Sequence, residues 1–142
     1  MSQLEARFPR LQDVVIPILR EALPEEVSVT SWTPDIDYRT FPIINIRRLG
    51  GFRHRGRPYD LDLPVIEMTV YDDKGLVETE DLYIEALNAL FDAQRTQKQV
   101  DYGYISHVRE TMGMTQFPAQ AMDTWRVQGL IQVGIRPPRK DK

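Results

Sequence analysis

Few side chains in this 142-residue chain are suited to catalysis, and its two histidines are the first to consider. His107 directly follows Ser106, and adjacent side chains on a strand point to opposite faces of a sheet. We therefore expect that these two residues cannot act as a nucleophile and its base. His54 lies among arginines, which disfavour its protonated form, and neither histidine has a second one at metal-ligand spacing. The chain has no cysteine, which excludes thiolate nucleophiles, thiolate zinc sites and disulfides.

The carboxylates are stronger candidates for chemistry. Asp60 and Asp62 would share one face of an extended segment, and Glu67 lies on the next predicted strand. This arrangement resembles the acidic PD…(D/E)xK cluster of metal-dependent nucleases, but Thr69 stands where that pattern has lysine, and Pro58 is not followed by an aspartate. A small metal-dependent nuclease is therefore only a minor alternative. We predict that the chain is not an enzyme and has no catalytic residues, metal site or cofactor.

Arginines dominate the segment from Arg47 to Arg57, which contains five of them and one histidine but no acid. Three of these arginines alternate and are flanked by Phe52 and Tyr59, an arrangement that could bridge phosphates and stack on bases. The formal net charge of −3 argues against a general nucleic-acid binder. Contact with an acidic protein surface is the favoured interpretation of this segment.

Charge is unevenly distributed along the rest of the chain as well. Residues 58–92 carry ten acids against a single base, Lys74, and the chain turns basic again after Ile135. One interpretation is that these charges simply lie on solvated loops and helix faces. The other is a molecule with oppositely charged faces that docks on copies of itself or on ordered partners.

Two amphipathic helices are predicted from apolar residues at helical spacing. The first covers Leu11 to Ala22, with Pro9 in its first turn, Pro17 expected to kink or split it, and Pro24 ending it. The second begins at about Leu76 or Thr79 and ends at Gln97. Acidic residues in its first turn stabilise the predicted helix, because they lie at the positive end of the helix dipole.

Five strands complete the prediction, at residues 27–32, 43–49, 64–71, 104–112 and 125–135. In the last strand Trp125, Val127, Ile131 and other apolar residues share one face, and the opposite face is mostly polar. The element order α-β-β-β-α-β-β predicts a single α+β domain over residues 1–142, with a mixed or antiparallel five-stranded sheet covered by two helices. Residues 50–57 are expected to form a flexible basic loop, and residues 137–142 a disordered basic tail. A long loop is also expected at residues 113–123.

Four segments carry a resemblance to a known family: FPIINIRRLGG (41–51), LPVIEMTVYDDKGLVETEDLYIEAL (63–87), HVRETMG (107–113) and WRVQGLIQVGIRPPR (125–139). Together they resemble the tail terminator proteins of siphophages that infect actinobacteria. The segments span most of the chain in the right order. They form an overall pattern and contain no catalytic signature, and a neighbouring head–tail connector protein of similar size is the main alternative.

The resemblance implies a structural virion protein at the head-proximal end of the phage tail, assembled in the host cytoplasm. Its subunits would form a homohexameric ring that caps the tail tube, ends tube polymerisation and joins the tail to the head connector. The implied partners are the chain itself, the tail tube protein and the connector protein, with no membrane contact. Genome DNA would pass through the ring without sequence-specific binding. The residues predicted to contact neighbouring subunits or partners are Arg47, Arg48, Arg53, His54, Arg55, Arg57, Arg126, Gln128 and Gln132.

Overall fold

Helix α2 (Leu11–Ala22) forms where the sequence places apolar residues at helical spacing. Leu11, Val14 and Leu19 are among its fully buried side chains. Pro17 lies on the exposed side of this helix. The helix continues through Pro17 and is not split into two pieces there. The predicted bounds are those observed, but Pro9 lies before the N-cap, Arg10, and not in the first turn as predicted. The computed structural model describes residues 8–31, 40–118 and 124–139 of the chain.

Helix α3 (Leu76–Thr96) begins at the earlier of the two predicted positions. The Thr79 hydroxyl donates a hydrogen bond of 2.7 Å to the Gly75 carbonyl oxygen, within the first turn. The helix ends at Thr96, and Gln97 forms the C-cap in a left-handed backbone conformation. The inward side of α3 is buried and consists of Thr79, Leu82, Tyr83, Ala86, Leu90 and Ala93.

The five strands form one mixed sheet in the order β1-β2-β3-β5-β4. They are β1 (Ser28–Thr30), β2 (Ile43–Arg53), β3 (Asp62–Asp72), β4 (Tyr104–Phe117) and β5 (Trp125–Arg136). The short edge strand β1 pairs in parallel with β2, and every other pair is antiparallel. The predicted α+β class and element order are therefore confirmed.

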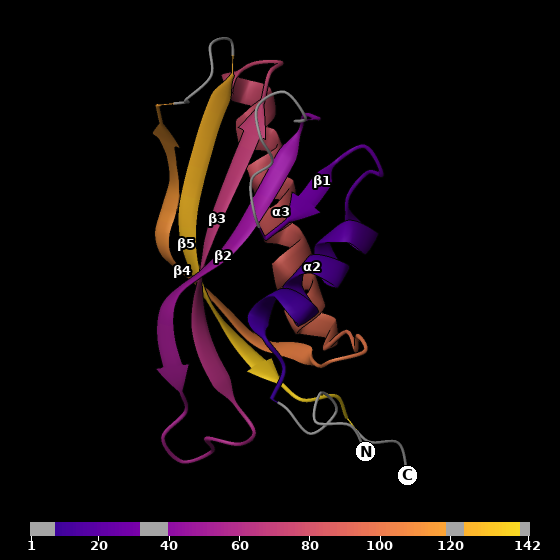
Figure 1. The fold of residues 1–142 in the computed structure, drawn as a ribbon, viewed down its shortest axis with the longest axis vertical. Coiled ribbons are helices and arrows are strands. Elements are labelled where there is room, and N and C mark those ends of the chain that lie inside the picture. The colour runs from indigo at the N-terminus through magenta and orange to yellow at the C-terminus, as the bar shows by residue number, and fades with distance from the viewer. Residues whose placement is uncertain (1–7, 32–39, 119–123, 140–142) are drawn as a thin grey trace.

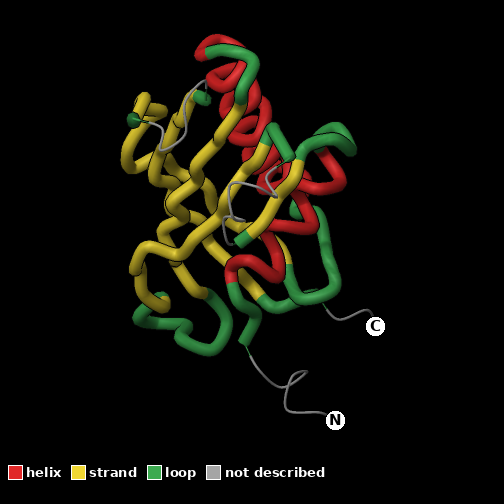
Figure 2. Tube along the Cα trace, turned by 45° about the horizontal axis from the view of Figure 1, so that its top comes forward, coloured by secondary structure: helices red, strands yellow, loops and turns green. Residues whose placement is uncertain are grey.

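Both helices cover the same face of this sheet, so the molecule has two layers (Figures 1 and 2). Apolar residues that align across the strands face the helices, for example Ile44, Val70 and Val127 in one row. Ile66 and Ile131 form another aligned pair in the same core. The sheet face on the side away from the helices is called the open face below.

Strands β2 and β3 form a hairpin that extends well past the core (Figure 1). The pairing continues to Arg53 opposite Asp62, with a bulge between Arg48 and Gly51. Both bulge glycines have positive φ, and a Cβ on Gly51 would lie 2.4 Å from the Leu63 carbonyl oxygen. The predicted loop start at Gly50 is therefore wrong: residues 50–53 are strand, and the connection spans residues 54–61.

Two other predicted irregular segments are also shorter than expected. Strand β4 continues to Phe117, so residues 113–117 of the predicted loop belong to the sheet. In the basic tail, the backbone N–H of Arg139 donates to Oε1 of Gln99 at 3.0 Å, and its guanidinium carbon lies 5.1 Å from the Tyr104 ring centroid. Residues 140–142, where the rest of the predicted disorder falls, lie outside the described part of the chain.

Candidate assembly surfaces

The residues predicted to contact partners do not form one continuous surface. They divide among the hairpin connection, the helix side of the sheet and the open face. In that order the groups are His54, Arg55 and Arg57; Arg48 and Arg53; and Arg47, Arg126, Gln128 and Gln132.

Two of the arginines stabilise the base of the hairpin. Arg48 makes a bidentate ion pair with Asp62, with N–O distances of 2.7 and 3.2 Å, and its Nε donates to the Gly50 carbonyl oxygen. Asp62 is only 4% exposed, so this pair supplies a counter-charge for a buried carboxylate. The guanidinium carbon of Arg53 lies 5.0 Å from the Phe8 ring centroid, beside the start of α2.

The hairpin connection is closed by hydrogen bonds of its own backbone. The N–H of His54 donates to the Leu61 carbonyl oxygen at 2.9 Å, and the N–H of Arg57 donates to the His54 carbonyl oxygen at 3.2 Å. The imidazole Nδ1 of His54 accepts a hydrogen bond of 3.1 Å from the Gly56 N–H. The side chains of Arg55 and Arg57 are exposed, and neither guanidinium forms a hydrogen bond or ion pair with a described residue. The connection therefore presents two unpaired positive charges.

The open face carries an ion pair between its second and third strands. Arg47 lies directly opposite Glu67 and donates to both carboxylate oxygens, at 3.1 and 2.8 Å. The hydrogen bonds and charge of Glu67 raise the pKa of the Arg47 guanidinium above its ordinary value. Because Arg47 is largely exposed, this pair contributes little to stability and remains accessible to a partner.

Arg126 is enclosed by its own neighbours on the open face. Its guanidinium carbon lies 6.0 Å from the Tyr71 ring centroid and 5.4 Å from that of Phe117, and Nη2 donates to Oε1 of Gln128 at 2.9 Å. The Thr69 hydroxyl donates to the same Gln128 oxygen at 3.0 Å. Gln128 is consequently buried, although the alternating pattern predicted that it would be accessible to a partner.

The remaining polar groups of the open face are less enclosed. Gln132 is half-buried and accepts a hydrogen bond of 3.2 Å from Arg109 of β4. Nε of Arg126 and Oδ1 of Asn45 are buried and have no hydrogen-bond partner within the described part of the chain. Such groups carry a desolvation cost that is not repaid within the isolated subunit.

Ser106 and His107 lie closer together than expected. The Ser106 hydroxyl oxygen is 2.7 Å from Nδ1 of His107, so the prediction that the two side chains cannot pair is wrong. The cause is a bulge between Ile105 and His107, which interrupts the alternation of side chains along β4. The half-buried Ser106 hydroxyl also donates to the Gly134 carbonyl oxygen at 3.4 Å.

The carboxylates considered for nuclease chemistry are separated by the fold. Asp62 is buried on the helix side against Arg48, whereas Glu67 faces the open side against Arg47. Asp60 lies exposed in the hairpin connection. Among the described residues no group of three or more histidine, cysteine or acidic side chains could hold a metal ion. The same residues include no helix with the length and apolar character needed to cross a membrane.

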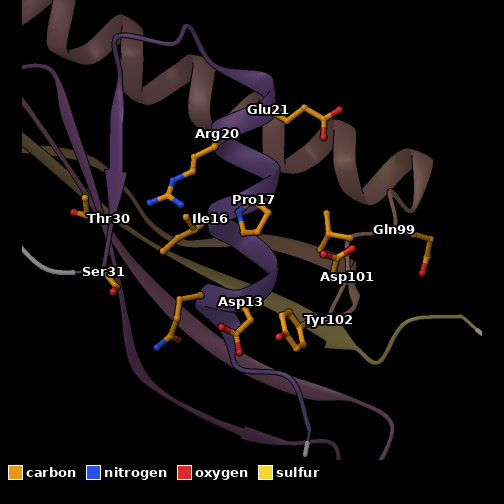
Figure 3. A pocket seen from close by; sticks show the side chains of 12 residues that line it. Asp13, Ile16, Pro17, Arg20, Glu21, Thr30, Ser31, Gln99, Asp101 and Tyr102 are labelled. Carbon is orange, nitrogen blue, oxygen red and sulfur yellow. The ribbon is translucent and has the colours of Figure 1, made fainter. Parts of the chain in front are cut away.

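A surface pocket of about 620 Å³ lies beside α2 (Figure 3). Thr30 and Ser31, at the end of β1, lie on one side of the helix, and Asp101 and Tyr102 lie on the other. Arg20 donates a hydrogen bond of 2.9 Å to the Val29 carbonyl oxygen of β1. The polar groups of the pocket therefore surround a helix and do not converge on one point, as a catalytic site would require.

Comparison with known protein families shows which family the chain belongs to. The family described as "Phage tail termination protein" matches residues 7–142, nearly the whole chain. The chain belongs to the phage tail termination protein family. The predicted resemblance is thus confirmed, and membership makes the chain a structural tail protein rather than an enzyme.

Two relatives and one solved structure are also similar to the chain. The Gene 22 protein of Mycobacterium phage L5 is 51% identical over 135 residues, covering 94% of this chain and 97% of the relative. The Gene 22 protein of Mycobacterium phage D29 is 51% identical over 133 residues, covering 93% and 96%. A chain in the structure "Virion of native gene transfer agent (GTA) particle" shares the fold, with a TM-score of 0.59, 11% identity and coverage of 89% and 94%.

Several residues of this tail termination protein that shape its surfaces were missed by sequence reasoning. Asp62 was considered only as a catalytic candidate, and Thr69, Tyr71 and Phe117 were not considered as neighbours of Arg126. The alternation of side chains along a strand places Thr69 and Tyr71 on the same face as Glu67, and the sequence alone could have shown this. Identifying them as neighbours of β5 also requires the strand order, which alternation does not provide.

Proposed function

We propose that six copies of the chain form a ring that caps the head-proximal end of the phage tail tube. The ring would end tube polymerisation and join the tail to the head connector. Its partners would be further copies of the chain, the tail tube protein and the connector, and genome DNA would pass through the lumen without sequence-specific binding. The family match over residues 7–142 is the observation that carries this proposal. The chain would assemble in the host cytoplasm and remain in the virion.

The surfaces of the subunit support a role in assembly. Residues 47–60 are all exposed, and they form a protruding arm (Figure 1). The open face is polar and not covered by either helix. Of the predicted contact residues, His54, Arg55, Arg57, Arg47 and Gln132 are the ones available to partners. The other four, Arg48, Arg53, Arg126 and Gln128, mainly support these surfaces from within the subunit.

A polymerisation assay tests this function directly. Purified tail tube protein would be allowed to extend tubes with and without the full-length chain, and tube lengths would be measured by electron microscopy. We expect the chain to bind tube ends and stop their growth. If the chain binds filled heads but leaves tube ends free to grow, it is a connector protein and the proposal is wrong.

A further inference from the structure

Helix α3 exposes a row of apolar side chains on the side that faces away from the sheet. Val77, Ile84 and Phe91 are 63%, 44% and 38% exposed. They lie seven residues apart, so they follow one line along the helix surface. The side chains of α3 that pack in the core lie on the opposite side of the helix. No described part of the subunit covers the exposed apolar row.

An acidic row runs beside these apolar residues. Glu78, Glu85 and Asp92 are exposed and have the same seven-residue spacing, displaced by one position. A groove of about 380 Å³ between α2 and α3 adjoins this row and is lined by Glu85, Asp92, Ile18 and Ala89, among others. Within the described part of the subunit only Asp92 among these acids forms an ion pair, with an Nη2–Oδ1 distance of 3.7 Å to Arg95. This face of α3 thus combines apolar contact area with excess negative charge.

The hairpin of β2 and β3 has the complementary composition. Phe52 and Tyr59 are 66% and 83% exposed, and the exposed guanidinium groups of Arg55 and Arg57 have no recorded partner among the described residues. Strand pairing to Arg53 and the hydrogen bonds of the connection hold the hairpin in shape. Such preorganisation reduces the entropy lost on docking.

We propose that the hairpin of one subunit docks on the exposed face of α3 in the next copy, with Arg55 and Arg57 facing the acidic row. Both charge and apolar exposure are matched between the two surfaces, and this favours a second copy as the occupant. The hairpin projects at one end of the sheet, away from α3, so one subunit cannot satisfy both halves of the contact itself (Figures 1 and 2). Two different surfaces in contact make a heterologous interface, which can close into a ring. The inference therefore rests on the proposed function and names the contact that builds the ring.

Cross-linking of mixed subunits tests the contact, because the chain has no native cysteine. Full-length Tyr59→Cys and Ile84→Cys subunits would be mixed, assembled on tail tubes and treated with a short bismaleimide. We expect a cross-linked dimer in the mixture and little in either variant alone. Tyr59→Cys mixed with Thr111→Cys, an exposed position on β4, serves as the matched control.

Charge reversal provides an independent test. Arg55→Glu with Arg57→Glu should weaken self-association by about tenfold or more, as should Glu78→Arg with Glu85→Arg, because like charges would then meet across the interface. Combining both pairs in one chain should restore association. Glu25→Arg with Glu26→Arg makes the same change at exposed positions elsewhere and should have no effect. An unchanged melting temperature would show that each variant folds.

The possible results separate this contact from the proposed function. Capped tails that give no 59–84 product, or a product that joins Tyr59→Cys to the tube protein, would overturn the contact while the capping function stands. Failure of the combined charge reversal to restore association would also overturn it. Tails that lack the chain altogether would overturn both proposals.

Discussion

The phenol of Tyr83 is buried between α3 and the sheet, and its hydroxyl has no hydrogen-bond partner among the residues that the structure describes. It lies directly against Gly129 of β5, where an added Cβ would be only 1.8 Å from the phenol oxygen. Burial raises the pKa of Tyr83 from 10.0 to about 12, and the negative charge of Glu110 adds to the shift. Gly129 is thus the residue that makes room for a large aromatic side chain in the core.

Tyr83 should make the protein sensitive to alkaline pH. Its folded-state pKa lies above the unfolded value, so its contribution to stability is complete below pH 10 and is lost as the pH rises toward about 12. Tyr83→Phe should remove this loss and change stability at pH 7 by less than about 1 kcal/mol, because the hydroxyl has no partner to lose. Urea unfolding from pH 7 to 11 measures both effects. Tyr59→Phe, at an 83% exposed position, should leave the pH dependence unchanged, and a similar effect of both variants would contradict the assignment.

Two glutamines of β5 should respond differently to alanine. Gln128→Ala should cost about 1–3 kcal/mol, since it leaves the Thr69 hydroxyl and the Arg126 guanidinium without their acceptor in a buried site. Gln132→Ala should cost about 0.5 kcal/mol or less, because its partner Arg109 is exposed to water. Chemical denaturation of the isolated subunit distinguishes the two. Equal costs would mean that the Gln128 network does not form.

At the scale of elements, the hairpin of β2 and β3 divides its arginines between stability and contact. Arg48→Ser should cost about 1–3 kcal/mol because the buried Asp62 carboxylate would lose its bidentate partner. Arg55→Ser with Arg57→Ser should leave the melting temperature nearly unchanged, since exposed unpaired charges contribute little. Calorimetry measures both, and a melting temperature that falls equally in the two variants would contradict this division.

The same hairpin shows what the sequence could and could not predict. Helical spacing located α2 and α3 well, because each buries one continuous side. Gly50 and Gly51 suggested a flexible loop, yet their positive φ values form a bulge within a continuous strand. A second bulge, at Ser106, reversed the expected relation to His107. Local composition does not distinguish a bulge from a loop, since the difference depends on pairing with a distant strand.

At the scale of the whole molecule, tertiary structure explains why the predicted contact residues lie on three separate surfaces. Adjacent arginines at positions 47 and 48 point to opposite faces of the sheet, and each pairs with a different acid of β3. The parallel pairing of β1 and the position of β5 between β3 and β4 depend on contacts between distant segments. The α+β class was predictable because it requires only the type and order of elements. The family was predictable from the four segments of resemblance.

Cryo-electron microscopy of virions that contain the labelled chain tests the central claim most directly. We predict one ring of six copies between the tail tube and the head connector, with the β2–β3 hairpin of each subunit against α3 of its neighbour. A ring with a different number of copies, or the chain located in another part of the virion, would contradict the account.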